Sequence, residues 1–415
     1  MKIVKKARGI YRIRVTAMMI LLLLLCRECL DPFPLPDVSE GLLVVDARFT
    51  DQVEKNRIIL SFAGQVNEGG VPVSGAIVYV QDLRGNTYNF MDSGMGIYLP
   101  EDDECRGTAD EEYVLQINLG DGRSYRSDTC LFIEVPPIEE LSWVLAERSS
   151  ENNTDLLKGV DIRLSTSDPE NRVRHYLWCY EETWEVRVPY PVMEEYIGDG
   201  HESSDFMRLD YSWECYLQAH SGDIMIKSTA DQDEARIENF PFTFVSNESS
   251  RLWRQYRIDV MQFALDEEAW IYHSRLREIT SQNGSVFDEQ PYSLEGNISR
   301  LDDPDEVVMG YFLVSGVSSR SIDISTWDLP VEYRGDYPLY LNCYYRADTF
   351  ALNQYTNIRN VIDRVAPRRN EIFVSSVWSE PLMGEPELIG LLLVPIECAS
   401  CEGTQEEPEN WPLTK

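Results

Sequence analysis

The feature that most constrains the fold is a series of short segments in which apolar residues occupy every second position. Residues 113–119 are the clearest case, and a Gly-Asp-Gly turn at 120–122 follows them. A period of two places successive side chains on opposite faces of an extended strand, so this segment predicts a half-buried strand that ends in a tight turn. Similar segments recur at intervals of about 10–15 residues between residues 42 and 135, which predicts a small β-sandwich.

Domain bounds follow from the places where this pattern is interrupted. We predict a mainly β protein in which residues 40–137 form an immunoglobulin-like or transthyretin-like β-sandwich, because paired prolines at 136–137 end the first series of strands. Residues 138–397 then form a larger β-rich domain, and residues 398–415 form a cysteine-containing tail. A chain of 415 residues is too long for one ordinary core, which also favours more than one domain.

One segment of the second domain has helical rather than strand periodicity. Its positions at helical spacing are Ala269, His273, Leu276 and Ile279/Thr280. Asp266 can cap the start of this helix, and the two glutamates that follow suit the positive end of a helix dipole. Ser-Gln-Asn-Gly at 281–284 predicts its end. We therefore expect one clear helix.

The first 25 residues have the pattern of a secretory signal peptide. Residues 1–15 carry six Lys and Arg side chains and no acidic residue. The apolar stretch at 17–25 that follows is much shorter than the roughly 20 residues of a membrane-spanning helix. We therefore predict that residues 1–25 direct export.

Two cysteines next to this signal are candidates for lipid attachment. Cys26 ends the apolar stretch, and Cys29 follows it. A bacterial lipid-attachment cysteine usually follows a small residue, whereas Leu25 and Glu28 precede these two, so the modified cysteine stays open. Residues 26–39 contain three prolines and predict a stiff, extended spacer. We expect a membrane-anchored protein, with a freely secreted chain as the alternative.

The net charge of −34 at pH 7 excludes some partners. Binding to a phosphate backbone needs clustered Lys and Arg, so we expect no nucleic-acid partner. Acidic stretches such as residues 101–104 lack the spacing of oxygen ligands in a calcium loop, so we predict no metal site. The sequence indicates no cofactor.

Short segments along the whole chain, in a fixed order, resemble one family. They lie at 29–32, 43–51, 72–86, 96–98, 121–127, 136–138, 181–184, 268–269, 284–291, 296–298, 308–312 and 398–411. Together these segments resemble the Bacteroidota outer-membrane lipoproteins catalogued as domain of unknown function 4249. Ala47 stands where that family usually has Gly.

The resemblance implies an envelope lipoprotein of the outer membrane that faces the periplasm or the cell surface. Such proteins are often encoded beside TonB-dependent outer-membrane receptors, so the expected partners are a receptor of this kind and the membrane that holds the lipid anchor. The resemblance implies no established activity and no catalytic residues. It leaves the ligand unidentified.

The Cys398-x-x-Cys401 pair allows three interpretations. Zinc needs about four ligands, and the sequence has no second CxxC and no His pair at finger spacing. A redox pair is expected near a βαβ unit, which the pattern does not show. In an exported chain we predict structural disulfides instead. Their connectivity stays open, and the other candidates are Cys105, Cys130, Cys179, Cys215 and Cys343.

A cluster of aromatic and acidic residues is the candidate ligand surface. Its members are Trp178, Tyr180, Glu181, Glu182 and Trp184. Aromatic faces stack on sugars, so the cluster could line a sugar-binding surface. The favoured alternative is a strand with ordinary aromatic packing.

The sequence favours a binding protein over an enzyme. It contains no Gly-x-Ser-x-Gly elbow, and its four His residues are scattered. We predict a lipid-anchored binding or accessory protein that assists a TonB-dependent receptor by capturing a nutrient or by scaffolding. A carboxylate-based glycan hydrolase and a structural surface adhesin are the alternatives.

Overall fold

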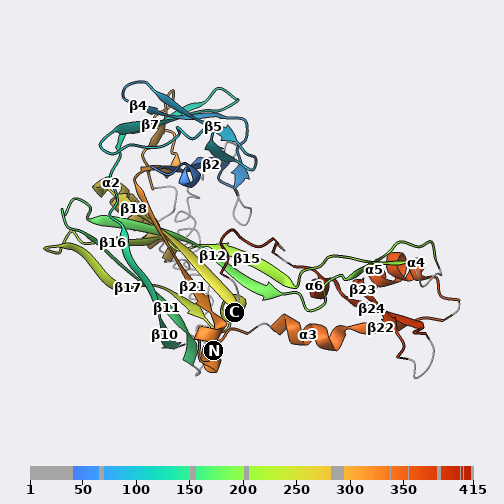
Figure 1. Ribbon diagram of the computed structural model, residues 1–415. Coiled ribbons are helices and arrows are strands. Elements are labelled where there is room, and N and C mark those ends of the chain that lie inside the picture. Colours follow the sequence, from blue (N-terminus) through green and yellow to red (C-terminus); the bar gives the residue numbers. More distant parts are fainter. Residues whose placement is uncertain are drawn as a thin grey trace, which may run out of the picture.

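The computed structural model describes residues 41–64, 70–149, 156–200, 205–281, 294–336, 338–353, 355–380, 385–401, 403–404 and 406–412. The predicted signal, the spacer and both candidate lipidation cysteines lie outside these residues. Among the described residues the protein is mainly β, as the alternating pattern predicts. Figure 1 shows three parts: a first sheet, a body of two further sheets, and an arm that projects from the body.

The first sheet follows the strand order β19-β8-β7-β4-β5-β6-β2-β1-β20, with β3 beside β2 and β9 beside β7. Its strands are β1 (Leu43–Phe49), β2 (Arg57–Phe62), β3 (Val71–Pro72), β4 (Ile77–Asp82), β5 (Thr87–Asp92), β6 (Ile97–Pro100), β7 (Glu112–Asn118), β8 (Ser124–Ser127), β9 (Cys130–Leu131), β19 (Ile298–Arg300) and β20 (Met309–Val314). The alternation expected at residues 113–119 is present, because Tyr113, Leu115 and Ile117 of β7 lie in the core of this sheet.

Two strands of this sheet come from late in the chain, so a domain boundary at residue 137 leaves them out. β20 pairs in parallel with β1, and β19 pairs with β8. Gly310 makes the parallel pairing possible, because it has a φ of +112° and a Cβ there would lie 1.8 Å from the Val45 carbonyl oxygen. The alternation of residues 42–135 carried no information about these distant partners.

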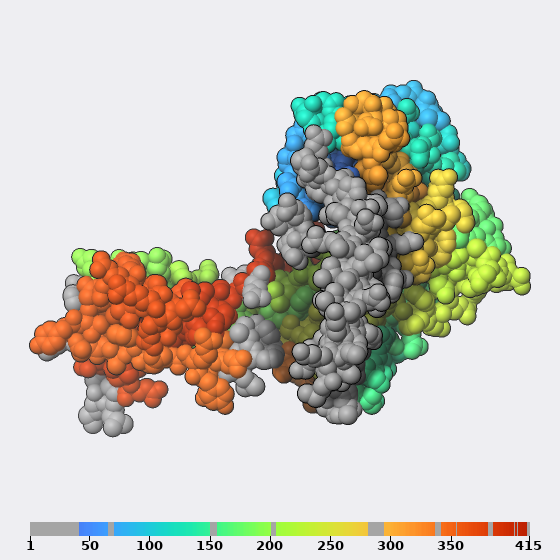
Figure 2. Space-filling view, turned by 180° about the vertical axis from the view of Figure 1, so that it is seen from behind, coloured from blue at the N-terminus to red at the C-terminus, as the bar shows by residue number. Residues whose placement is uncertain are grey.

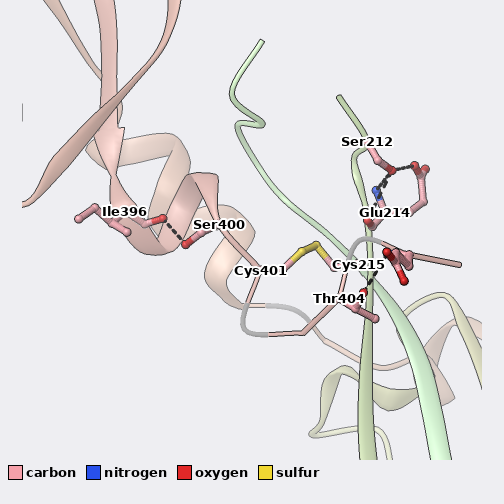
Figure 3. The surroundings of a disulfide bond; sticks show 8 residues. Ser212, Glu214, Cys215, Ile396, Ser400, Cys401 and Thr404 are labelled. Atoms are coloured by element: carbon pink, nitrogen blue, oxygen red, sulfur yellow. Dashed lines mark hydrogen bonds between the residues drawn. A yellow bond between two sulfur atoms is a disulfide. The ribbon is translucent and has the colours of Figure 1, made fainter. Parts of the chain in front are cut away.

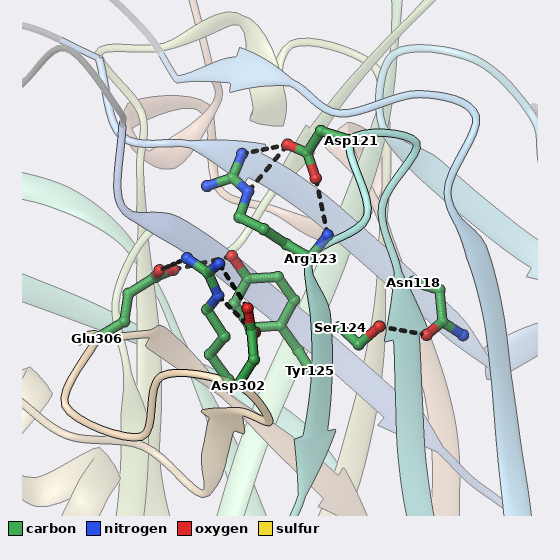
Figure 4. Close-up of polar contacts among 8 residues, drawn as sticks. Asn118, Asp121, Arg123, Ser124, Tyr125, Asp302 and Glu306 are labelled. Atoms are coloured by element: carbon green, nitrogen blue, oxygen red, sulfur yellow. Dashed lines mark hydrogen bonds and ion pairs between the residues drawn. The ribbon is translucent and has the colours of Figure 1, made fainter.

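A group of paired charges fastens β19 to the sheet (Figure 4). Arg300 Nη1 lies 2.5 Å from Glu306 Oε2, and its Nε lies 2.8 Å from Asp302 Oδ1. The Tyr125 hydroxyl on β8 donates to Glu306 Oε1 at 2.8 Å. Every charge drawn there has a partner, so we interpret this group as structural.

The body is a sandwich of two sheets. The second sheet has the order β10-β11-β17, and the third has the order β15-β12-β18-β21 with β16 also beside β12. Their strands are β10 (Ile138–Ser149), β11 (Leu156–Asp168), β17 (Ala235–Ser246), β12 (His175–Arg187), β15 (Glu214–His220), β16 (Met225–Ser228), β18 (Gln255–Leu265) and β21 (Val317–Ser325). Alternate residues of β11 and β18, such as Ile162 and Ile258, form the core between the two sheets.

Helix α2 (Glu267–Ser281) forms where helical spacing predicted it. The Asp266 carboxylate accepts a hydrogen bond from the Ala269 backbone N–H at 2.7 Å, which is the expected cap. Ala269 and Tyr272 pack with Phe263 of the third sheet and Leu313 of the first. The helix therefore lies between these two sheets.

The prediction of one clear helix was incomplete. The structure also contains α3 (Pro338–Arg346) and the short helices α4 (Ile358–Asn360), α5 (Ala366–Arg368) and α6 (Ile396–Ala399). Even α3 makes only about two and a half turns, too few for a periodic apolar pattern to be recognised. Among the described residues, no helix is long and apolar enough to cross a membrane.

The arm is the part of the predicted domain 138–397 that leaves the body (Figure 1 and Figure 2). Its sheet has the order β22-β24-β23, and a hairpin of β13 and β14 packs beside it. These strands are β13 (Glu194–Tyr196), β14 (Phe206–Arg208), β22 (Asp348–Ala351), β23 (Glu371–Trp378) and β24 (Leu388–Pro395). Two small apolar clusters, separate from the body core, hold the arm together.

Candidate functional site

The predicted ligand surface on β12 proves to be mostly interior. Trp178 is completely buried in the core of the sandwich. Its ring stacks on Phe240 with centroids 5.6 Å apart, and its Nε1 donates to Gln262 Oε1 at 2.8 Å. Trp178 is therefore a core residue, as the alternative of ordinary aromatic packing predicted.

Glu182 and Trp184 belong to a buried polar network beside that core. The Glu182 carboxylate accepts hydrogen bonds from Arg251 Nε at 2.9 Å and from the Tyr256 hydroxyl at 2.6 Å. Burial, and then the adjacent carboxylate, raise the pKa of Tyr256 well above its ordinary value. Trp184 Nε1 donates to Ser250 Oγ at 3.0 Å, and Arg251 lies over the Trp184 ring. Each of these groups has a partner among the described residues, so we interpret the network as structural.

The two remaining members of the predicted surface lie apart from each other. Tyr180 is half-buried and packs edge-on against Phe242 in the sandwich, with ring centroids 5.5 Å apart. Glu181 is about half exposed, and its Oε1 lies 3.7 Å from His220 Nδ1. Because neighbouring residues of a strand point to opposite faces, β12 separates Glu181 from the other four. Glu181 lines a cavity on the far side of the strand, and Trp178 and Tyr180 also border this cavity.

This cavity lies between the first sheet, the third sheet and α2, and its volume is about 590 Å³. Its walls carry charged groups from β1 and β12 and aromatic groups from α2 and β20: Asp46, Arg48, Glu181, Tyr272, His273 and Tyr311. Cavities of roughly 300–1,000 Å³ with a mostly apolar lining and a few polar groups hold small molecules in other proteins. The cavity is therefore our candidate functional site.

Arg48 is one of three positive charges on the β1 side of the cavity, with Lys55 and Arg57. Its Nη2 lies 3.4 Å from Asp46 Oδ2, and its Nη1 lies 3.8 Å from Cys179 Sγ. Burial disfavours the charged guanidinium, but Asp46 and Cys179 outweigh this effect and raise the pKa of Arg48 above its ordinary value. Arg48 is therefore cationic at neutral pH.

An aromatic group from α2 and β20 lines the cavity beside the charged residues of β1. The rings of Tyr272 and Tyr311 lie 4.9 Å apart, and the His273 ring lies 5.8 Å from Tyr311. Burial lowers the pKa of His273 to about 4, so its imidazole is neutral at pH 7. His273 Nε2 is buried and has no hydrogen-bond partner within the described part of the chain.

Cys398 and Cys401 both form disulfides, but not with each other. Cys343 of α3 pairs with Cys398 of α6, and Cys215 of β15 pairs with Cys401. Figure 3 shows the second bond, which ties the arm to the third sheet of the body. The zinc and redox interpretations do not fit these pairings. The described cysteines that remain as thiols are Cys105, Cys130 and Cys179.

The cavity shows no arrangement typical of a catalyst. Two of its carboxylates, Asp46 and Glu181, face the cationic or basic side chains of Arg48 and His220. Burial raises the pKa of the Cys179 thiol, which disfavours the reactive thiolate. Among the described residues, no group of His, Cys, Asp and Glu could hold a metal ion. Nothing in this geometry points to a catalytic activity.

Residues 31–321 match a family model described as "Domain of unknown function (DUF4249)". No curated protein matches the chain. Among solved structures, the chain is similar to trypsin-activated alpha-2-macroglobulin from Escherichia coli, with 13% identity and a TM-score of 0.15. That likeness covers 55% of this chain, which spans only 15% of the other protein. So low a score carries no structural argument.

Proposed function

The chain belongs to the family described as domain of unknown function DUF4249, and we propose that it is an exported protein that captures a small molecule. The observation that carries this proposal is the cavity of about 590 Å³ between the first and third sheets. Its walls combine apolar groups with Arg48 and with an imidazole that lacks a partner among the described residues. Such a lining suits a binding site. Of the two predicted roles, ligand capture and scaffolding, capture therefore has the better support. A protein that only scaffolds would not need the cavity.

We further propose that the protein is a Bacteroidota outer-membrane lipoprotein that passes its ligand to a TonB-dependent receptor. The signal-like residues 1–25, Cys26 and Cys29 support the anchor. The arm supports a protein partner, because Tyr344, Tyr345 and Tyr355 are 68%, 81% and 82% exposed. Exposed aromatic side chains are enriched in protein interfaces.

The alternatives have less support. A carboxylate-based glycan hydrolase needs a pair of carboxyl groups, one of them able to donate a proton, whereas two of the carboxylates that line the cavity, Asp46 and Glu181, face basic groups. A purely structural adhesin has no use for an internal cavity.

Filling the cavity tests the capture of a ligand. Leu276 lines the cavity on α2, so Leu276→Trp should block it. Ile271 lies on the same helix but is exposed, and Ile271→Trp is the matched control. We expect native mass spectrometry of protein purified from its own membranes to show a bound small molecule in the wild type and in I271W, and none in L276W. Retention of the same molecule by folded L276W would refute the proposal.

Anchoring and partnership need separate tests. Changing Cys26 and Cys29 together to Ala should release the protein into the soluble fraction, and the single changes should identify the modified residue. Cross-linking in intact membranes should join the wild-type protein to an outer-membrane receptor. If the double variant stays in the membrane, the proposed lipid anchor is wrong. If no cross-linked adduct with a receptor forms, the proposed receptor partner is wrong.

A further inference from the structure

Arg48 has a longer ion pair than two other arginines with a similar exposed fraction. Its side chain is 18% exposed, as is that of Arg300, but the shortest ion pair of Arg300 measures 2.5 Å and that of Arg48 measures 3.4 Å. Arg257, which is 16% exposed, lies 2.8 Å from its carboxylate partner. A guanidinium carries five N–H donors. Among the described residues the Arg48 guanidinium lies over the Phe263 ring, 5.8 Å from its centroid. Its two polar contacts, to Asp46 and Cys179, are both too long to be strong hydrogen bonds.

The position of Asp46 explains why it does not bind Arg48 tightly. The same carboxylate oxygen also lies 4.0 Å from Arg57, so one anion stands between two guanidinium groups. Both arginines line the cavity. On the β1 side of the cavity Arg48, Lys55 and Arg57 outnumber Asp46 and Glu54, although the chain has a net charge of −34. Two further carboxylates, Glu181 and Asp223, line the cavity from the segments around β12 and β15.

A second, independent polar group faces the same space. His273 Nε2 is buried without a partner among the described residues, and the His273 side chain lines the cavity. A buried nitrogen without a hydrogen bond is costly, so native structures usually satisfy it with protein, water or ligand. Apolar side chains such as Leu276, Met309 and Leu313 also line the cavity.

We propose that the cavity binds a small amphiphilic molecule with an oxyanion head, a carboxylate or a phosphate, held by Arg48, and with an apolar body that packs on the walls. Guanidinium binds such heads with two parallel hydrogen bonds. His273 Nε2 forms a hydrogen bond with a polar atom of the same molecule. This inference rests on the proposed capture of a ligand and adds the chemical class of that ligand.

The test uses two fluorescent probes that differ only in charge. Dansylaminoundecanoic acid carries the carboxylate, and its methyl ester lacks it. We expect the wild-type full-length protein to bind the acid at least about tenfold more tightly than the ester. Arg48→Met should weaken binding of the acid by about tenfold and leave binding of the ester unchanged. Arg257→Met is the matched control, because Arg257 is equally buried but lies outside the cavity, and it should keep the preference for the acid.

The possible outcomes separate this inference from the proposed function. Equal binding of acid and ester by the wild type would overturn the oxyanion head but leave ligand capture standing. Binding of neither probe, by a protein that also retains no native ligand, would overturn both. If R48M does not fold, Arg48→Lys keeps the charge without the planar fork, and it should retain part of the preference for the acid. Competition by dodecanoate against dodecyl phosphate then identifies the preferred head.

Discussion

Ala47 on β1 lies beside Phe312 on β20 in the parallel pairing of the two strands. Both side chains are completely buried in the core of the first sheet. A tight turn cannot connect parallel strands, and here the connection runs through the second and third sheets. The core of the first sheet is therefore complete only when a segment from late in the chain returns to it.

From this pairing we expect the isolated fragment 40–137 not to fold cooperatively, although its strand pattern predicted a separate β-sandwich domain. Without β20, the fragment exposes the edge of β1 and loses the side chains of Phe312 and Val314 from its core. Thermal melting and NMR dispersion of the fragment are the measurements. Joining residues 294–317 to the fragment through a flexible linker is the control and should restore a sharp transition. A dispersed spectrum from residues 40–137 alone would contradict this view.

A second prediction separates the two adjacent glutamates of β12. Glu182→Gln removes the negative charge beside Arg251 and leaves one acceptor oxygen where the carboxylate accepts from both Arg251 and the Tyr256 hydroxyl, so it should lower the free energy of unfolding by about 3 kcal/mol. Glu181→Gln changes a half-exposed side chain and should cost less than about 0.5 kcal/mol. Urea denaturation measures both. Equal effects would show that the Glu182 network is not structural.

The strands could be predicted from the sequence, but the site could not. Alternation fixed the buried face of β7, because Tyr113, Leu115 and Ile117 pack into one core. Trp178 shows one limit of prediction from sequence. An aromatic residue near acidic residues is compatible with a ligand-binding surface and with a buried core, and only its packing partners distinguish the two.

Arg48 shows the other limit. On β1, Val45 and Ala47 are buried in the first sheet, so Asp46 and Arg48 occupy the opposite face. A strand face with charges at every second position predicts contact with water. In the structure, α2 and the third sheet approach this face and enclose it, and no local pattern encodes that approach. One sequence feature could have pointed to this site: Asp46 and Arg48 both lie within the segment 43–51 that resembles the family.

The cysteine pairing gives a third prediction. Because Cys215, Cys343, Cys398 and Cys401 are oxidised, iodoacetamide should leave all four unmodified in denaturant unless a reductant is present. Cys105, Cys130 and Cys179 should react in denaturant without reduction. Peptide mass spectrometry distinguishes the two groups, and digestion without reduction should yield a 215–401 and a 343–398 linked peptide. A peptide that links 398 to 401 would disprove the pairing.

The last prediction follows from the burial of His273. Burial lowers its pKa to about 4, against an ordinary value of 6.5, while Asp46 opposes this shift and Arg48 adds to it. Between these two pH values the unfolded chain binds more protons at this site than the folded chain, so stability rises with pH. The contribution of His273 to the free energy of unfolding is fully present above about pH 6.5, and it is lost as the pH falls toward 4. Its upper limit is about 3 kcal/mol, from the pKa difference alone.

We expect His273→Gln to flatten the dependence of stability on pH over this window, because Gln cannot be protonated there. The measurement is urea unfolding of the wild type and the variant at several values between pH 4.5 and 7.5. Carboxylates titrate in the lower part of the same range, so the comparison is between the slopes of the two proteins rather than their absolute stabilities. His220→Gln is the matched control, since the His220 side chain is 69% exposed, and it should keep the wild-type slope. Equal slopes for H273Q and the wild type would show that His273 is not buried as a neutral imidazole, and the polar wall of the cavity would then need a different assignment.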